Sequence, residues 1–525
     1  MKKGAISIFS LFKSLSFPVA GLALVFFLDG PPQQASAQTA TSNDPAQTRA
    51  WAPAAIEHAQ RMRVFRDADR GSQPTPPVIP RFEADGDASG QIATFQPGGP
   101  TFTALNPFFQ NLGTNGRTCF TCHQPQEGWT VSAAGVQARF KASHGADPIF
   151  RLVDGATCPS DDVTTLKAKR EAYKLLIEKG LIRIGMPLPA PDILQFEVVL
   201  KKVVDPYNCT TNPKTGLTSP TTGIMSMYRR PLPSTNLGFL STIMADGREP
   251  DLESQAIDAT LGHAQGNPNT PLTVEQQRQI VDFETGIFTA QNFDKEAGNL
   301  QALHATGGPK ALSQQLAKFF IGVNDPFDPN LRKGMPFDKN IFDLYKYWQS
   351  LRGEDDKEQD RKSVARGEVV FNTLPIKITD VAGINDVLKV KTFNGFCGTC
   401  HDTPNAGDHS IKAPLDIGIA DAGAKSPPDL DISGLPVFTL KCTQGPLKGQ
   451  TFVVTDPGRA LISGNCADIG KIKGLTLRGL AARAPFFHNG SAATLLDAVN
   501  FYDKRFTIGF TDQQKEDLVN FLKTL

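Results

Sequence analysis

The chain has 525 residues, which is enough for about three domains and a large buried core. It carries 54 Lys and Arg against 53 Asp and Glu, and this balance excludes a strongly basic nucleic-acid binder and an acidic disordered chain. The 35 phenylalanines, beside 6 tyrosines and 3 tryptophans, suit the apolar wall of a large cofactor, and an ordinary core equally well.

The first 37 residues have the features of a secretion signal. Lys2 and Lys3 form a positive start, residues 17–28 are apolar, and residues 35–37 are small, as at a cleavage site. The apolar run is too short to span a bilayer. We therefore expect an exported, periplasmic protein without a membrane span and without a nucleic-acid partner.

The region that follows the signal has little periodicity. Residues 38–105 are rich in Pro, Gly, Ala and polar residues, which predicts an extended arm or linker. Farther along, a helix is predicted from Asp161 to Gly180, with the glycine as its stop. Strands are predicted at 181–184 and 196–204.

The pattern Cys-x-x-Cys-His occurs twice, at 119–123 and at 397–401. It is the attachment motif of c-type haem, in which both thiols bond to the porphyrin and the histidine donates a ring nitrogen to iron. A thioredoxin-like redox pair needs a strand-to-helix context and a zinc site needs a second nearby ligand pair, and neither is present. The predicted cofactors are two covalently bound c-type haems, attached to Cys119, Cys122, Cys397 and Cys400, with His123 and His401 as iron ligands.

The other four cysteines are predicted to form disulfides, as is usual in exported proteins. Cys158 and Cys209 lie in the first half of the chain, and Cys442 and Cys466 lie in the second. Pairing within each half is the simplest of the three possible connectivities.

An internal repeat relates the two halves. Thr273 with Gln276, and Thr511 with Gln514, form capping boxes that each open an amphipathic helix with apolar residues at matching positions. Each half is therefore expected to begin with a haem motif and to close with a helix over the haem. The expected fold is mainly α, with two cytochrome c-like haem modules and small β insertions. The expected organisation is a signal peptide at 1–37, an arm at 38–105, a first haem module at 106–300, a connector at 301–360 and a second haem module at 361–525.

The run LTLRGLAARAPFFHNGSAATLLDAVNF, residues 475–501, resembles the signature of bacterial di-haem cytochrome c peroxidases and their relative MauG, and residues 236–255 resemble the segment before the peroxidatic pocket of that family. The resemblance implies that the second haem relays electrons, with an axial ligand fourteen residues after His488, at Tyr502. Peroxidases of the family usually carry methionine there, and the MauG branch carries tyrosine, a hard donor that stabilises ferric iron. Tyr502 as an ordinary half-buried helix residue is the alternative.

The resemblance also implies that peroxide reacts at the first haem, beside a glutamine and an acid–base residue. Gln255 matches the glutamine, but the position of the family glutamate falls on Gln265. We expect His263, two residues earlier, to replace it, because imidazole titrates near neutral pH. His263 as a sixth iron ligand or as a structural residue remains open. His144 is a further possible ligand, or else an exposed loop residue.

Other positions depart from the family or have open roles. The family has a tryptophan between the haems, and Ala245 occupies that position in this sequence. Trp129 is either its replacement or a packing residue. The asparagine that binds calcium falls on Arg230, which makes an inherited calcium site doubtful. His488 is not expected to bind iron, and the resemblance implies that it orders the pocket near the haem through hydrogen bonds. A structural or propionate-binding role for it stands beside a catalytic one, and the same alternatives hold for His409.

The expected function is therefore that of a periplasmic di-haem c-type oxidoreductase. It would reduce hydrogen peroxide at the first haem, or use it to oxidise a substrate, with electrons relayed by the second haem. The reductant would be a small cytochrome, a copper protein or an organic substrate. The alternatives are a di-haem oxygenase that uses dioxygen on an apolar substrate, and an electron-transfer cytochrome with both irons six-coordinate.

Overall fold

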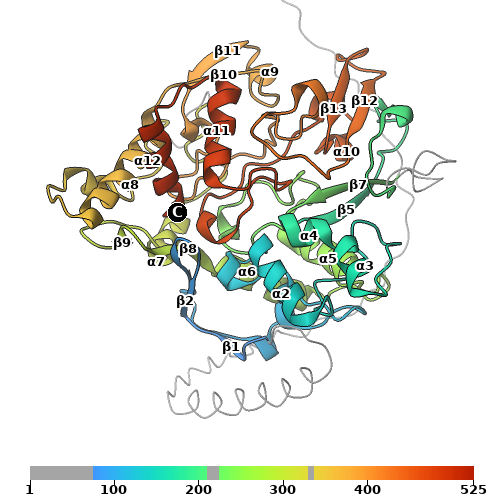
Figure 1. Ribbon diagram of the computed structural model, residues 1–525, viewed down its shortest axis with the longest axis horizontal. Helices are drawn as coiled ribbons and strands as arrows, with labels where there is room; N and C mark the ends of the chain where they lie inside the picture. The colour runs from blue at the N-terminus through green and yellow to red at the C-terminus, as the bar shows by residue number, and fades with distance from the viewer. Residues whose placement is uncertain (1–74, 210–223, 329–335) are drawn as a thin grey trace, which may run out of the picture. The chain divides into compact units, whose positions relative to one another are not determined.

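Helices and small antiparallel sheets alternate along the chain (Figure 1). The computed structural model describes residues 75–209, 224–328 and 336–525, which belong to one unit, Ala52–Leu525. The signal peptide and Met335 lie outside the described residues. None of the described helices is both long and apolar enough to cross a membrane.

The helices are α2 Ala133–Ser143, α3 Leu166–Ala172, α4 Lys174–Lys179, α5 Leu252–His263, α6 Val274–Gly286, α7 Pro309–Gln315, α8 Asp356–Thr373, α9 Asn385–Leu388, α10 Ala460–Ser463, α11 Leu495–Phe506 and α12 Asp512–Lys523. The strands are β1 Val78–Ile79, β2 Phe82–Gly86, β3 Gly90–Phe95, β4 Thr101–Phe102, β5 Ile182–Pro187, β6 Phe196–Val198, β7 Ile224–Arg229, β8 Phe288–Asp294, β9 Gly298–Asn299, β10 Ile376–Thr379, β11 Thr392–Gly395, β12 Phe438–Cys442 and β13 Thr451–Val454. The fold is thus rich in helix but contains several small sheets, and the expectation of a mainly α fold holds only in part.

The segment expected to be an arm is, from Val78 onward, part of a sheet. β3 is an inner strand of the four-stranded sheet β2-β3-β8-β9, and its Ile92 and Ala93 are buried. The arm prediction is wrong here because the strands are short and the partner β8 lies far along the chain. Local periodicity therefore contains little sign of the pairing.

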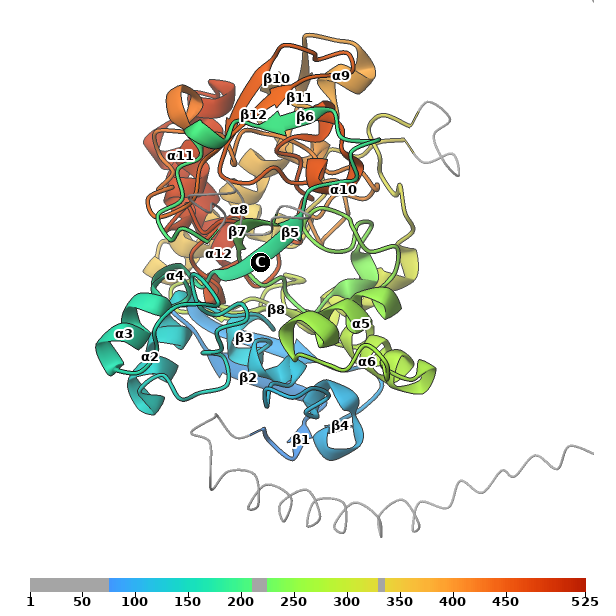
Figure 2. The same cartoon turned by 90° about the vertical axis from the view of Figure 1, so that its right-hand side faces the viewer.

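The segment between Cys158 and Cys209 pairs with the second half of the chain. The structure pairs Cys158 with Cys209 and Cys442 with Cys466, as predicted. The predicted helix at 161–180 is instead two helices, α3 and α4, and α4 ends at Gly180, whose φ of +62° is left-handed. Only β6 forms in the second predicted strand, and it pairs with β12 of the second half (Figure 2).

The two predicted closing helices are present with their capping boxes, as α6 and α12. Each buries the apolar face expected from its sequence, with Ile280 and Phe283 in α6 and Leu518 and Phe521 in α12. α12 packs closely on α8, where a Cβ at Gly367 would lie 2.0 Å from a backbone oxygen of α12.

A second repeat relates α5 to α11, which have equal lengths. Each follows a turn whose residue eight positions before the helix has a left-handed backbone, Met244 with φ of +62° and Phe487 with φ of +66°. Asp251 and Thr494 cap the two helices in the same way, each accepting a hydrogen bond from the backbone N–H three residues later. The two helices are therefore equivalent elements of the two halves.

A buried ion-pair network ties β7 to the second half. Arg229 donates to Asp456 at 2.6 and 2.9 Å and contacts Asp246 at 2.5 Å. His488 Nε2 lies 3.6 Å from Asp456 Oδ2, the oxygen that Arg229 contacts at 2.6 Å. Burial by itself would raise the pKa of Asp456, but the charge and hydrogen bonds of Arg229 outweigh it and lower the pKa to about 2.

The first testable prediction concerns Asp456. Because its folded-state pKa lies below its ordinary value near 4, Asp456 contributes stability above about pH 4 that is lost as the pH falls toward 2. Asp456→Asn should lower the free energy of unfolding at pH 7 by about 3 kcal/mol and remove this part of the acid dependence. The measurement is denaturant unfolding of the holoprotein from pH 6 down to the acid range.

Asp282→Asn, at an exposed position on α6, is the matched control and should change stability by less than about 0.5 kcal/mol. Equal effects of the two substitutions would show that the buried network does not stabilise the fold.

Candidate functional site

Each Cys-x-x-Cys-His motif folds as a short 3-10 turn, Cys119–Thr121 in the first half and Cys397–Thr399 in the second. In each turn the threonine hydroxyl accepts a hydrogen bond, at 2.9 Å, from the backbone N–H of the residue before the first cysteine. None of the four motif cysteines is in a disulfide. The thiols are therefore available for thioether bonds to a porphyrin.

Both motif histidines are oriented by a backbone carbonyl six residues later. His123 Nδ1 lies 2.9 Å from Trp129 O, and His401 Nδ1 lies 2.7 Å from Gly407 O. A carbonyl accepts only, so each Nδ1 carries the hydrogen and each Nε2 keeps a lone pair for a metal. Burial lowers the pKa of His123 to about 4 and also lowers that of His401, which favours the neutral form that ligation requires.

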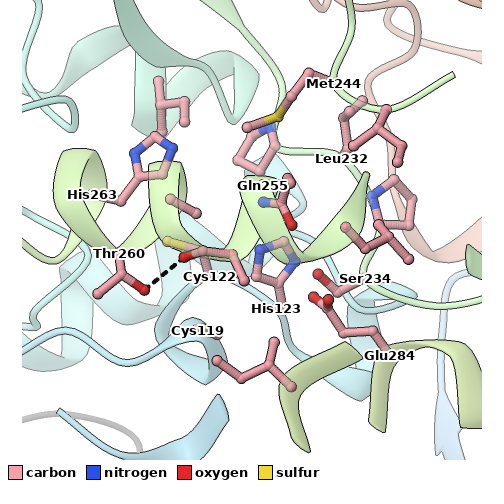
Figure 3. Close-up of a pocket in the computed structure, with 18 of the residues that line it drawn as sticks. Cys119, Cys122, His123, Leu232, Ser234, Met244, Gln255, Thr260, His263 and Glu284 are labelled. Atoms are coloured by element: carbon pink, nitrogen blue, oxygen red, sulfur yellow. Dashed lines mark hydrogen bonds between the residues drawn. The ribbon is translucent and has the colours of Figure 1, made fainter. Parts of the chain in front are cut away.

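Each motif borders a cavity. The first cavity has about 1330 Å³ of empty space and is lined by the motif at 119–123, by one face of α5 and by α6. Figure 3 shows Gln255, Thr260 and His263 of α5 around this cavity with the first motif. The second cavity has about 1850 Å³ and is lined by the motif at 397–401, by α11 and by α12. The closing helices thus cover the two cavities as the sequence predicts, and the free thiols and oriented histidines fit a c-type haem in each.

The two cavities present equivalent faces of equivalent helices. Five of the six cavity-lining residues of α5, Leu252, Gln255, Ala256, Ala259 and His263, match the cavity-lining residues Leu495, Ala498, Val499, Tyr502 and Phe506 of α11 position for position. The sixth, Thr260, has no lining counterpart in α11. Tyr502, the expected axial ligand, therefore corresponds to Ala259. Gln255 and His263, the expected catalytic pair, correspond to an alanine and a phenylalanine.

His263 is held by a buried carboxylate that the sequence analysis did not identify. Its Nδ1 lies 2.6 Å from Asp154 Oδ2, and Arg117 Nη1 lies 2.5 Å from Asp154 Oδ1. Burial opposes ionisation of Asp154, but Arg117 and His263 together lower its pKa below the ordinary value. Asp154 is thus an anion that fixes the hydrogen on Nδ1 of His263 and leaves Nε2 free to accept a proton.

Glu284 is a second carboxyl group that the sequence analysis missed. It lines the first cavity from α6, beside Ser234 (Figure 3), and burial raises its pKa to about 7. Its Oε2 has no hydrogen-bond partner among the described residues. The sequence does contain a sign of this role, because Glu284 follows Ile280 by four residues and so lies on the apolar face of α6. Gln265, where the family has its glutamate, does not line the cavity.

Three other candidates lie away from both cavities. His144 is exposed at the C-terminal end of α2 and lines neither cavity, so it is not placed to bind iron. His409 is buried against Asp402, with Nδ1 at 3.2 Å, in agreement with the expected structural role. Trp129 lies behind His123 in the core, packed on Phe283, which supports its packing alternative.

Tyr502 and His488 both line the second cavity. Tyr502 is surrounded by aromatic rings, with Phe501 at 5.3 Å and Phe506 stacked at 6.4 Å between centroids, and burial raises the pKa of its phenol. His488 has no hydrogen-bond partner for either ring nitrogen among the described residues, and burial lowers its pKa to about 4. It is therefore neutral, and the expected ordering hydrogen bond is not formed with the described protein groups.

The two cavities share a wall. Residues 230–233, which follow β7, line both cavities, and so does Lys473. Ala245, at the family tryptophan position, lines the first cavity, and its carbonyl accepts from Lys473 N at 2.9 Å. Among the described residues, no tryptophan lines either cavity.

Comparison with curated proteins finds similarity to cytochrome-c peroxidases. The chain is 31% identical over 145 residues to cytochrome-c peroxidase IdrP1 of Denitromonas iodatirespirans, a match that covers 25% of this chain and 36% of the relative. Over 147 residues it is 29% identical to cytochrome-c peroxidase IdrP1 of Pseudomonas sp. (strain SCT), with 25% and 38% covered. Over 149 residues it is 29% identical to cytochrome-c peroxidase IdrP2 of Denitromonas iodatirespirans, with 27% and 38% covered. The chain thus spans only 36% to 38% of the length of these curated relatives.

Among solved structures, the chain is similar to a MauG-like protein associated with microbial copper homeostasis, with 16% identity and a TM-score of 0.31 over 57% of this chain and 74% of the other. No family model matches the chain. Over about a quarter of its length, the chain is thus similar in sequence to named cytochrome c peroxidases, the family that its motif segments resemble.

Proposed function

We propose that the protein is a periplasmic di-haem c-type oxidoreductase that reduces hydrogen peroxide in the first cavity, with electrons relayed through the second. The observation that carries this proposal is the difference between the matching faces of α5 and α11. At the matching positions the first cavity has an amide and an acid–base group where the second has apolar groups, and Tyr502 of the second cavity is matched by Ala259 in the first.

A c-type haem, when bound, supplies an iron whose sixth coordination position is either filled by a side chain or open to a small molecule. In this proposal Tyr502, which lines the second cavity, would fill that position there. The methyl group of Ala259, at the matching position of the first cavity, cannot do so. The difference supports a reactive first cavity and a closed, electron-relaying second cavity.

His263 is the proposed acid–base residue of the first cavity. Its free Nε2 can take the first proton of the peroxide and return it to the oxygen that leaves as water, while Asp154 holds Nδ1 in place. Gln255, on the same face of α5, can donate its amide hydrogen to orient the peroxide. Two electrons and two protons convert one peroxide molecule into two water molecules. The electrons would come from a small cytochrome or a copper protein.

The location and the relay are parts of the same proposal. Export to the periplasm is supported by the signal-like segment at 1–37. The relay is supported by the shared wall at residues 230–233, which leaves one short segment of chain between the two cavities.

The deciding experiment combines electron paramagnetic resonance of the purified holoprotein with assays of its peroxide consumption and its dioxygen uptake. We expect a high-spin ferric signal from the first haem, fully oxidised or after one-electron reduction, and consumption of peroxide with a reduced small cytochrome. Low-spin signals alone in both states would support an electron carrier. Dioxygen uptake with an apolar substrate and without peroxide would support the oxygenase instead.

The second testable prediction concerns Ala259. Ala259→Tyr should place in the first cavity the side chain that the second cavity has, so the high-spin signal of the first haem should disappear and peroxide turnover should fall at least tenfold. Haem content should stay unchanged. Gly262→Ala on the same helix, where an added Cβ meets nothing within 4 Å, is the control and should change neither readout. A turnover in Ala259→Tyr equal to that of the control would show that α5 does not cover the reacting position.

The third testable prediction concerns His263. His263→Gln removes the proton acceptor, and kcat for peroxide should fall by roughly 100-fold, in the range found for general acid–base groups. Both haems should remain attached. His144→Gln, at an exposed position, is the control and should keep full turnover. Unchanged turnover in His263→Gln would exclude the acid–base role and favour Glu284 as the proton carrier.

A further inference from the structure

The wall shared by the two cavities contains positive charges without negative partners. Arg230 and Lys473 line both cavities, and Arg483 lines the second. Their side chains are buried, at 9%, 7% and 8% exposure. Within the described part of the chain, none of the three forms an ion pair with a carboxylate, whereas the neighbouring Arg229 pairs with two.

The hydrogen bonds of Arg230 show how its guanidinium is positioned. It donates to the carbonyl oxygens of Lys179 at 3.0 Å, Val131 at 2.5 Å and Arg483 at 2.9 Å. A guanidinium has five N–H groups, so two of those of Arg230 have no acceptor among the described residues. Three backbone segments therefore hold the cation rigidly in the wall while leaving part of it available to a ligand.

Lys473 is held in the same manner. Its Nζ donates to Thr242 O at 2.8 Å, which leaves two of its three hydrogens unassigned. Asp246, a nearby carboxylate, is already engaged by Arg229 and Arg248. Glu127, the carboxylate that acts on Arg230, accepts instead from the backbone N–H of Ser132 at 2.6 Å. Asp408 is the carboxylate that acts most strongly on Lys473, but burial raises the pKa of Asp408 to about 7, so it is only partly ionised near neutral pH. Among the described residues, no carboxylate forms an ion pair with Arg230 or Lys473, and the protein therefore neutralises this pair only in part.

Burying like charges together is unfavourable unless an anion compensates them. Arg230 and Arg483 repel one another, and desolvation lowers the pKa of Arg230 to about 9 and that of Lys473 to about 8. An anionic ligand that reaches the wall from either cavity would remove this cost. Because Arg230 and Lys473 face both cavities, the site can take one anionic group from each side.

We propose that Arg230 and Lys473, assisted by Arg483, form a carboxylate-binding site in the shared wall, and that its ligands are the carboxylate side chains of the porphyrins attached at the two motifs. This inference rests on the proposed occupation of both motifs by haem. The shared cations then couple the two cavities electrostatically, because each of them acts on both irons. A free dicarboxylate is the other source of the same chemistry.

The fourth testable prediction is a change of reduction potential. Arg230→Gln removes a positive charge that faces both cavities and leaves porphyrin carboxylates uncompensated, which stabilises ferric iron. Both haem potentials should therefore fall, and Lys473→Gln should lower both as well. Arg230→Lys keeps the positive charge, so both reduction potentials should stay close to their wild-type values. The measurement is a spectroelectrochemical titration of the holoprotein, without peroxide.

Arg278→Gln is the matched control, because it removes one exposed arginine charge from α6, the helix that covers the first cavity, and should leave both potentials unchanged. Potentials in Arg230→Gln equal to those of this control, with both haems attached, would overturn the inference. If Arg230→Gln does not accumulate as holoprotein, Lys473→Gln decides the question in the same way.

A titration with succinate separates the two sources of carboxylate. We expect no saturable change in the haem spectrum of the wild-type holoprotein, since the site is already filled. A saturable change that Arg230→Gln abolishes would show a site open to free anions and would overturn the assignment to the porphyrins. If the wild-type holoprotein does not turn over peroxide but the variants still shift the haem reduction potentials as expected, only the proposed function is overturned.

Discussion

The hydrogen bond from each motif histidine to a backbone carbonyl six residues later is the interaction on which the two sites depend. It settles which ring nitrogen carries the hydrogen, and it leaves the lone pair of the other nitrogen for a metal. Desolvation by the surrounding core lowers the pKa of both imidazoles and so favours their neutral form. In the first half, Trp129 supplies the carbonyl, and its ring packs in the core beneath. A residue that could be taken for an electron relay thus has a positioning role.

The chain uses one scaffold twice and gives the two copies different chemistry. α5 and α11 have the same length, the same type of preceding turn and the same inward face. A few side chains on that face give the first cavity an amide and an oriented imidazole and give the second cavity apolar groups and a phenol at the matching positions. The closing helices α6 and α12 differ in the same way, because α6 adds Glu284 to the first cavity.

Charge is distributed unevenly at the junction of the two halves. Arg229 is fully paired with Asp456 and Asp246, and this network holds β7 to the second half. Arg230, the next residue, is bonded only to carbonyl oxygens and faces both cavities. Adjacent arginines thus have different roles, since one stabilises the fold and the other presents a buried positive charge to whatever fills the cavities.

The sequence by itself determined the features that depend on neighbouring residues, namely the two haem motifs, the capping boxes of α6 and α12 and the stop at Gly180, because their signals are short-range. The disulfide pairing also followed from position along the chain. Only the tertiary structure decided the pairing of β3 with β8, the contact of Asp154 with His263 and the match of Ala259 to Tyr502. Each of these joins residues far apart in the chain, and local periodicity contains no record of such distant packing.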